Sequence, residues 1–227
     1  MQYVYPPVRT SVLQLICSFV FVIGAQAAFP ASDGTRLYAP CVVCHQPNAR
    51  GSPDGRIPNL AGQKERYLAR QIASFRSKAR VSTAMRLVSA HSTFSNPLEV
   101  SSLADYLSAL ESNPKPVTGA GEHLRLGQEI YTHLCTGCHG HDGRGGPDDR
   151  VPRIAKQHYP YLRRQLDEVA LLHRKLISRE MTTVLRNMRP QEKDALADYI
   201  SRLENSEALL DLNPRDTRET LPGPISH

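Results

Sequence analysis

The chain has 227 residues, a formal net charge of +6, no Trp and only 6% aromatic residues. This length allows one or two small domains, and two half-size domains would each lack apolar core unless a large prosthetic group supplied the missing volume. A basic chain could bind nucleic acid, but here Lys and Arg are scattered among acidic residues and the N-terminus predicts export. We therefore expect no nucleic-acid partner.

The N-terminus is typical of a secretory signal peptide. Arg9 precedes an apolar run over residues 12–23, which is short for a membrane span. Ala-Gln-Ala at 25–27 has the small-x-small form of a cleavage site, so residues 1–27 are predicted to be removed. An uncleaved anchor is the alternative. The mature protein is expected to be soluble and periplasmic, and peripheral association with a membrane stays open.

Two cysteine pairs dominate the chemistry of the sequence, because Cys17, the fifth cysteine, falls within the predicted signal peptide. Each pair has the form Cys-x-x-Cys and a histidine follows it directly: Cys41, Cys44 and His45, then Cys135, Cys138 and His139. Two thiols at this spacing can reach the two vinyl groups of one porphyrin, and the adjacent imidazole then lies under the iron. The sequence therefore predicts two covalently bound haem c groups, with the two histidines as axial ligands of the iron.

Three alternatives exist for these cysteines. Zinc binding is disfavoured because the pairs lie 94 residues apart and each has its own histidine. Thioredoxin-like redox pairs are disfavoured because no strand-helix pattern precedes either pair. Two disulfides in an oxidising compartment are the third alternative. The two haem motifs use every cysteine of the mature chain, which favours haem attachment.

An internal repeat relates the two halves of the chain. A shift of 94 residues superposes the two haem motifs, and 15 of the 35 positions from 41–75 and 135–169 are identical. We interpret the chain as a duplication with one haem in each half. Pro and Gly mark the boundary between the halves. The predicted segments are a signal peptide (1–27), a first cytochrome c domain (28–112), a linker (113–121), a second cytochrome c domain (122–205) and a polar C-terminal tail (206–227).

The secondary structure is predicted to be helical, since apolar residues recur at three- and four-residue spacing and no strand pattern is convincing. Helices are expected over 65–76, 100–110, 124–134, 160–173 and 191–203. The predicted fold is all-α: two tandem domains, each a small helical bundle closed around a flat porphyrin.

Each iron needs a ligand opposite its histidine, and the methionines are the candidates. Met85 follows His45 by 40 residues and Met181 follows His139 by 42. Met188 competes with Met181, but it lies at the start of the last helix, where an apolar packing residue is normal. We predict Met85 and Met181 as the distal ligands. A thioether ligand stabilises ferrous iron and raises the reduction potential.

Histidine is the alternative distal ligand. His91, His158 and His173 lie near the two sites, whereas His141 is too close to His139 to reach the other face of the haem. We expect His158 and His173 at the surface.

Other positions are predicted to support the haems. The carbonyls of Pro58 and Pro152, each 13 residues after an axial histidine, are candidates to orient its ring. Arg56 and Arg150 either pair with haem propionates or are solvated. Tyr67 and Tyr161 either place a hydroxyl near a propionate or pack in the core with an exposed tip.

The chain resembles the cytochrome c4 family of periplasmic two-haem cytochromes. The resemblance rests on the tandem Cys-x-x-Cys-His domains and on Ile-Pro-Asn-Leu-Ala-Gly-Gln at 57–63, which recurs as Val-Pro-Arg-Ile-Ala-Lys-Gln at 151–157. It implies class I cytochrome c domains, His/Met ligation and haems close enough to exchange electrons. The chain departs from this pattern at Lys156, where the first half has Gly62, and at Val169-Ala170, where the first half has Phe75-Arg76.

The resulting hypothesis is an electron carrier of a respiratory chain. Its partners are expected to be redox proteins, namely an electron-donor complex and a terminal oxidase or reductase, met in weak and transient encounters. The first alternative is the cytochrome subunit of a periplasmic dehydrogenase. The second is an enzyme, such as a two-haem peroxidase or a thiosulfate-oxidising cytochrome. A methionine for each iron argues against an open catalytic iron, so no catalytic residue is assigned.

Overall fold

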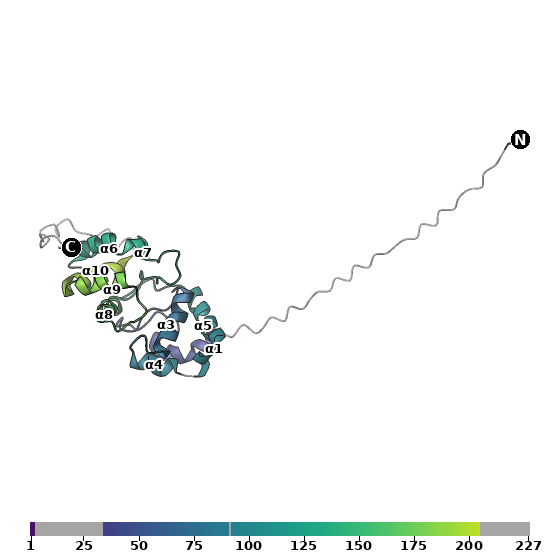
Figure 1. The fold of residues 1–227 in the computed structure, drawn as a ribbon, viewed down its shortest axis with the longest axis horizontal. Helices are drawn as coiled ribbons and strands as arrows, with labels where there is room; N and C mark the ends of the chain where they lie inside the picture. The colour runs from purple at the N-terminus through teal and green to yellow at the C-terminus, as the bar shows by residue number, and fades with distance from the viewer. Residues whose placement is uncertain (3–33, 91, 205–227) are drawn as a thin grey trace.

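The computed structural model describes residues 1–2, 34–90 and 92–204, so the predicted cleavage site and the predicted tail at 206–227 lie outside the described residues. Within the described part, all regular structure is helical apart from one isolated antiparallel bridge between Arg80 and Arg174. The all-α prediction is therefore confirmed. Figure 1 shows two groups of helices lying side by side. None of the helices in the described ranges combines the length and apolar character needed to span a bilayer.

The helices repeat in the same order in both halves. The first half has α1 (Gly34–Tyr38), η1 (Ala39–Cys41), α2 (Val42–His45), α3 (Glu65–Arg76), α4 (Thr83–Ser89), η2 (Ser92–Ser95) and α5 (Pro97–Ala109). The second half has α6 (Leu124–Leu134), α7 (Thr136–His139), α8 (Tyr159–Ala170), α9 (Arg179–Asn187) and α10 (Pro190–Arg202). In each half the first and last helices pack together, α1 on α5 and α6 on α10.

A glycine and a tyrosine pair define each of these helix crossings. Gly127 lies so close to α10 that a Cβ there would overlap the carbonyl oxygen of Ala195. The rings of Tyr131 and Tyr199 then meet at 5.6 Å between centroids, and the equivalent rings of the first half meet at 6.0 Å. Aromatic pairs in this range add to the apolar packing of the core. Each half thus has its own buried cluster beside its haem motif.

The predicted helix bounds agree with the structure at α3 and α6 and differ elsewhere. Helix α8 ends at Ala170, three residues before the predicted end, because Leu172 adopts a left-handed φ of +60°. Helix α5 begins at Pro97, since the side chain of Asn96 caps it by accepting from the backbone N–H of Leu98. Helix α10 spans Pro190–Arg202, one residue earlier at each end than predicted.

The segment at 113–121, predicted as a linker, is fixed by one carboxylate of the second half. Asp198 accepts hydrogen bonds from the backbone N–H groups of Gly119 and Gly121, at 2.8 and 2.7 Å, and from Arg202 Nε at 2.9 Å. The Asp198 side chain is only 9% exposed. The segment is therefore attached to α10 by charge-assisted hydrogen bonds.

A set of reciprocal polar contacts, which we call the seam, joins the two halves. Gln63 donates to the carbonyl of Arg153 at 2.8 Å and accepts from its N–H at 2.9 Å. The equivalent Gln157 donates to the carbonyl of Asn59 and accepts from its N–H, both at 2.9 Å. A shift of 94 residues relates these two pairs, so the seam has approximate twofold symmetry.

Candidate haem sites

The two haem motifs begin at equivalent places in the fold. Cys41 is the last residue of η1, and Cys135 directly follows α6. Both are half-buried, whereas Cys44 and Cys138 are exposed. No disulfide joins any two of these four cysteines, so the disulfide alternative is not supported. Burial, followed by the neighbouring cysteine, raises the pKa of Cys41 to about 11 and of Cys135 to about 12. In the described ranges no three His, Cys, Asp or Glu residues gather as a metal site.

The axial histidines are buried and held by one backbone contact each. His45 Nδ1 lies 3.1 Å from the carbonyl oxygen of Pro58, and His139 Nδ1 lies 3.2 Å from that of Pro152. These are the carbonyls predicted from the sequence. Burial lowers the pKa of both histidines. A neutral ring that donates from Nδ1 leaves the Nε2 lone pair free to bind iron.

The two predicted methionine ligands occupy matching positions in short helices. The N–H of Met85, the third residue of α4, donates to the hydroxyl of Ser82 at 3.3 Å. The N–H of Met181, the third residue of α9, donates to the hydroxyl of Ser178 at 3.1 Å. Both methionines are half-buried. Met188 instead follows the last residue of α9, and it packs against the core of the second half, as Met181 also does.

The histidines considered as alternative iron ligands differ in how far they are buried. His91 lies outside the described residues, and His141 and His173 are exposed. The expectation that His158 lies at the surface is wrong, because it is only 3% exposed. Its Nδ1 accepts from the N–H of Val117 at 3.0 Å and its Nε2 lies 2.7 Å from the carbonyl oxygen of Arg50. Both ring nitrogens are thus used at the seam.

Of the two alternatives for Arg56 and Arg150, the structure supports the solvated one. The side chains of Arg56 and Arg150 are 78% and 71% exposed, and each pairs with an aspartate two residues earlier in the chain. Short local ion pairs of this kind are favoured because Asp and Arg bracket a tight turn.

Sequence reasoning missed a buried cation at the seam, Arg80. It is 8% exposed, and its guanidinium donates to Gln71 Oε1 at 2.8 Å, to the Tyr161 hydroxyl at 2.8 Å and to Gln165 Oε1 at 2.6 Å. The Nε of Arg80 is buried without a hydrogen-bond partner. The nearby Glu168 carboxylate accepts from Gln165 Nε2 rather than from the guanidinium.

Arg174 forms the mirror image of this arrangement. It is also 8% exposed and donates to Gln165 Oε1 at 3.1 Å, to the Tyr67 hydroxyl at 2.9 Å and to Gln71 Oε1 at 3.1 Å. Burial raises the pKa of Tyr67, but the guanidinium groups of Arg174 and Arg80 outweigh this effect and lower it overall. Arg80 and Arg174 are themselves equivalent at the shift of 94. Extending the repeat alignment by five positions would have found them.

The two buried arginines, Arg80 and Arg174, suit a cofactor that carries carboxylates. In the described residues, neither guanidinium forms a hydrogen bond with a carboxylate, and one buried N–H has no partner. Two buried cations close together are costly unless anions compensate them. Haem c brings two propionate carboxylates, so Arg80 and Arg174 are suited to receive them, in place of the exposed Arg56 and Arg150.

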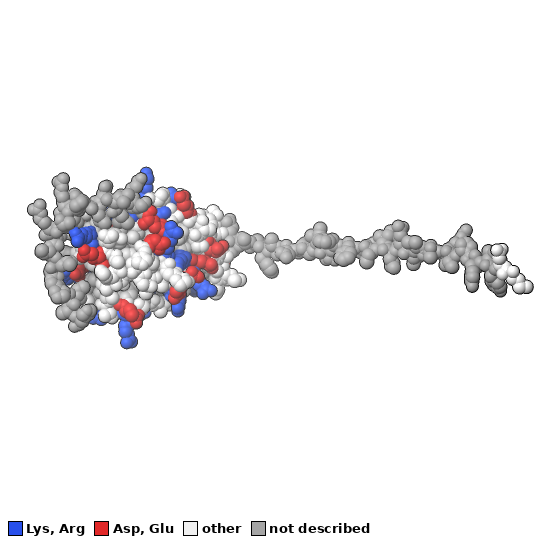
Figure 2. All heavy atoms as spheres, turned by 90° about the horizontal axis from the view of Figure 1, so that it is seen from above, with Lys and Arg blue, Asp and Glu red and all other residues white. Residues whose placement is uncertain are grey.

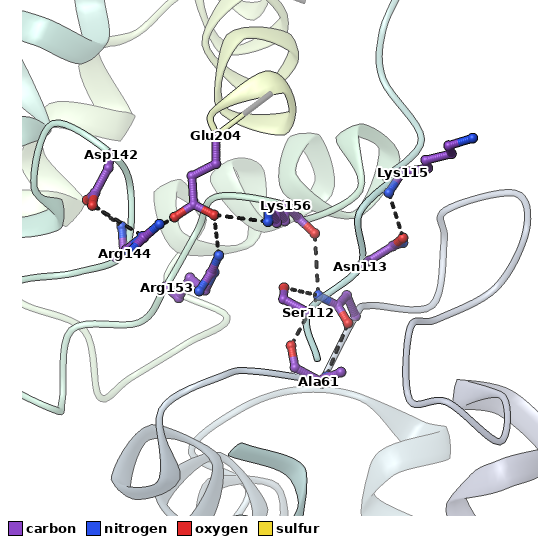
Figure 3. A network of polar contacts seen from close by, with 10 residues as sticks. Ala61, Ser112, Asn113, Lys115, Asp142, Arg144, Arg153, Lys156 and Glu204 are labelled. Carbon is purple, nitrogen blue, oxygen red and sulfur yellow. Dashed lines mark hydrogen bonds and ion pairs between the residues drawn. The ribbon is translucent and has the colours of Figure 1, made fainter. Parts of the chain in front are cut away.

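The second half has a further ion cluster that explains one departure from the family pattern. Glu204, whose side chain is 7% exposed, pairs with Arg144 and Arg153, and Lys156 Nζ lies 3.4 Å from it (Figure 3). Lys156 has a left-handed φ of +57°, and the equivalent Gly62 of the first half has a left-handed φ of +68°. The pairing of Lys156 with Glu204 offsets the strain of that conformation. On the face drawn in Figure 2, acidic and basic side chains are interspersed.

The comparisons with known proteins agree with this geometry. The cytochrome c family pattern matches residues 31–111 and again residues 124–204. Over 157 residues the chain is 31% identical to cytochrome c4 of Azotobacter vinelandii, which covers 63% of this chain and 74% of the relative. Over 185 residues it is 30% identical to the thiosulfate dehydrogenase electron acceptor of Thiomonas intermedia, covering 72% and 78%.

A solved structure gives the same fold. Reduced recombinant cytochrome c4 from Pseudomonas stutzeri superposes with a TM-score of 0.66 at 23% identity, covering 76% of this chain and 98% of that one. The tandem all-α architecture is therefore shared along the whole length of that protein. Together with the two family matches and the two Cys-x-x-Cys-His motifs, these findings show that the chain belongs to the cytochrome c family, and within it to the two-haem, electron-carrying cytochromes c4.

Proposed function

We propose that the chain passes electrons between redox proteins of a periplasmic respiratory chain, from an electron-donor complex toward a terminal oxidase or reductase. We propose that Cys41 and Cys44 attach the first haem, with His45 and Met85 as its iron ligands. Cys135 and Cys138 attach the second haem, with His139 and Met181 as its iron ligands. The observation that carries the proposal is that one ligand geometry occurs twice. In each domain a buried histidine is held by a proline carbonyl and a methionine lies at the third position of a serine-capped helix.

The side chains prepare each site for electron transfer without rearrangement. The Pro58 and Pro152 carbonyls fix the histidine rings, and the Ser82 and Ser178 caps fix the helix turns that carry the methionines. When bound, haem supplies reversible one-electron chemistry at its iron. Two protein ligands for each iron leave no position for a substrate, so we propose that the chain is a carrier and not a catalyst.

The periplasmic location is proposed from the export pattern at residues 1–27 and from the covalent haem motifs. The donor and acceptor are expected to be soluble or membrane-bound redox proteins that contact the exposed haem-motif cysteines, Cys44 and Cys138. Such contacts are small and short-lived, which suits a shuttle.

The test is ligand binding by the reduced, haem-loaded protein. We expect a mass gain of two haems on the denatured chain, and no fast carbon monoxide binding at neutral pH. Peroxide should be consumed no faster than by other six-coordinate cytochromes. Loss of haem into acidic organic solvent would overturn covalent attachment, and rapid carbon monoxide binding or peroxide turnover would overturn the carrier role.

A second candidate is supported by one comparison, the similarity to a thiosulfate dehydrogenase electron acceptor. The chain would then accept electrons from a thiosulfate-oxidising enzyme. A purified thiosulfate dehydrogenase with thiosulfate should in that case reduce both haems within seconds. No reduction under conditions where the same enzyme reduces its own acceptor would exclude this candidate.

A further inference from the structure

Four exposed aliphatic side chains lie on two loops that pair with each other at the seam. Val81 is 60% exposed, and Leu171, Leu172 and Leu176 are 64%, 55% and 54% exposed. The loops that carry them pair across the seam, since the N–H of Val81 donates to the carbonyl of His173 at 3.1 Å. On the other side of the Arg80–Arg174 bridge, the N–H of Lys175 donates to the carbonyl of Ala79 at 2.8 Å. We call Val81, Leu171, Leu172 and Leu176 the seam patch.

Positive charge predominates on the loops that carry the seam patch. Residues 76–82 and 171–179 contain no acidic residue, and the acids that flank the second segment are Glu168 in α8 and Glu180 in α9. Lys78, Lys175 and Arg179 are exposed there. Exposed cations therefore outnumber acids beside the aliphatic side chains.

The leucines of the seam patch are specific to the second domain. The positions equivalent to Leu171 and Leu172 are Ser77 and Lys78, and Leu176 lies two residues before Ser178, the cap that matches Ser82. Lys78 and Leu172 share a left-handed φ of +60°. An exposed Leu in this conformation bears both the strain of the backbone and the cost of an apolar side chain in water. Core packing does not require it, because the same fold is built with Lys78.

We propose that the seam patch binds the anionic headgroup surface of a phospholipid membrane. Aliphatic side chains can enter the boundary between headgroups and acyl chains while the adjacent cations remain among the phosphates. A protein partner is disfavoured because the patch has no aromatic residue or Met, which anchor protein interfaces. A second copy of the chain is disfavoured because its own cations would meet these cations. This inference does not depend on the proposed function.

The experiment is vesicle flotation of the haem-loaded, secreted protein. Vesicles of equimolar phosphatidylglycerol and phosphatidylcholine should carry it upward, and pure phosphatidylcholine should not. The double variant Leu172→Ser/Leu176→Ser should bind about tenfold more weakly. Lys175→Glu should also weaken binding about tenfold, and added salt should reproduce its effect.

Matched controls are available on the same molecule. Leu98→Ser removes an exposed Leu from α5, and Lys115→Glu reverses an exposed charge at the linker. Both should float like the unsubstituted protein, with unchanged haem spectra in every variant. Equal flotation of all variants would place the binding elsewhere, such as at the N-terminus, and overturn the proposal. Absence of flotation would also overturn the proposal. Binding of poly-L-glutamate would then indicate an acidic protein partner, and a dimer in sedimentation would indicate a second copy of the chain.

Discussion

His158 shows how a single ring can join three parts of the molecule. It belongs to the second domain, accepts from the backbone of the linker at Val117 and contacts the carbonyl of Arg50 in the first domain. These two contacts require the neutral tautomer with its proton on Nε2. A second proton on Nδ1 would oppose the N–H of Val117.

The stability of the protein should therefore depend on the protonation of His158. Burial lowers the pKa of His158, although the Arg50 carbonyl and Asp54 oppose the shift. A histidine with a lowered folded pKa contributes stability that is complete above its unfolded pKa of about 6.5 and is lost as the pH falls through the folded value. Urea midpoints measured from about pH 7.5 to about pH 5 should fall in the wild type and less in His158→Gln. Identical slopes would contradict this assignment.

The distal ligand of the second haem can be identified by replacing each candidate methionine in turn. Met181→Ala should remove about half of the near-infrared band that reports sulfur bound to ferric iron. Met188→Ala should keep the band and cost about 1–2 kcal/mol of stability, because it deletes a half-buried packing residue. The reverse pattern would show that Met188 is the ligand.

At this scale the sequence predicts local features better than contacts between the two halves. The haem motifs and the orienting carbonyls follow from local spacing, and Pro58 and Pro152 lie where they were expected. Arg80 and Arg174 were missed because a buried cation is unusual and is stable only when a partner half and a cofactor are present. Local sequence carries no sign of either condition.

Among the helices, length and periodicity decided what could be predicted. Helix α3 was placed at its correct bounds because its apolar residues recur over three turns. Helices α4 and α9 have only 7 and 9 residues and were not predicted. Their serine caps are the visible signal, but a short capped turn is common in loops as well. The early end of α8 depends on a left-handed Leu that no propensity would suggest.

The repeated Ala-Asp-Tyr of α5 and α10 offers an internal control for the linker contact. Asp198 is buried and receives two linker N–H groups, whereas the equivalent Asp105 is exposed. Asp198→Asn should lower the free energy of unfolding by about 1–3 kcal/mol, because charge-assisted bonds in a buried site are weakened. Asp105→Asn should change it by less than about 0.5 kcal/mol. Urea denaturation of the two variants gives the comparison, and equal losses would show that the linker contact adds nothing.

Taken as a whole, the molecule concentrates positive charge between its two haem domains. Arg80 contacts Gln71 of its own domain and Tyr161 and Gln165 of the other, so its charge acts on both sites. Removing a nearby positive charge favours the ferric state of a haem, since that state carries the additional charge.

Arg80→Gln should therefore lower the reduction potentials of both haems, by an amount on the order of tens of millivolts. Arg56→Gln should leave both potentials unchanged, because that side chain is solvated and paired with Asp54. Spectroelectrochemical titration resolves the two haems. A shift of one potential alone would show that Arg80 serves a single domain.

The symmetry of the seam also bears on how such a chain could have arisen. Arg70 donates to the carbonyl of Arg150 at 2.6 Å, and its equivalent Arg164 donates to the carbonyl of Arg56 at 2.9 Å. These two contacts, like those of Gln63 and Gln157, are related by exchange of the two domains, as in an isologous homodimer. A one-domain ancestor could have paired with a copy of itself through the same surface, before gene fusion made the pairing permanent. Fusion then freed the two copies to diverge, and the replacement of Lys64 by His158 at equivalent positions is a trace of that divergence.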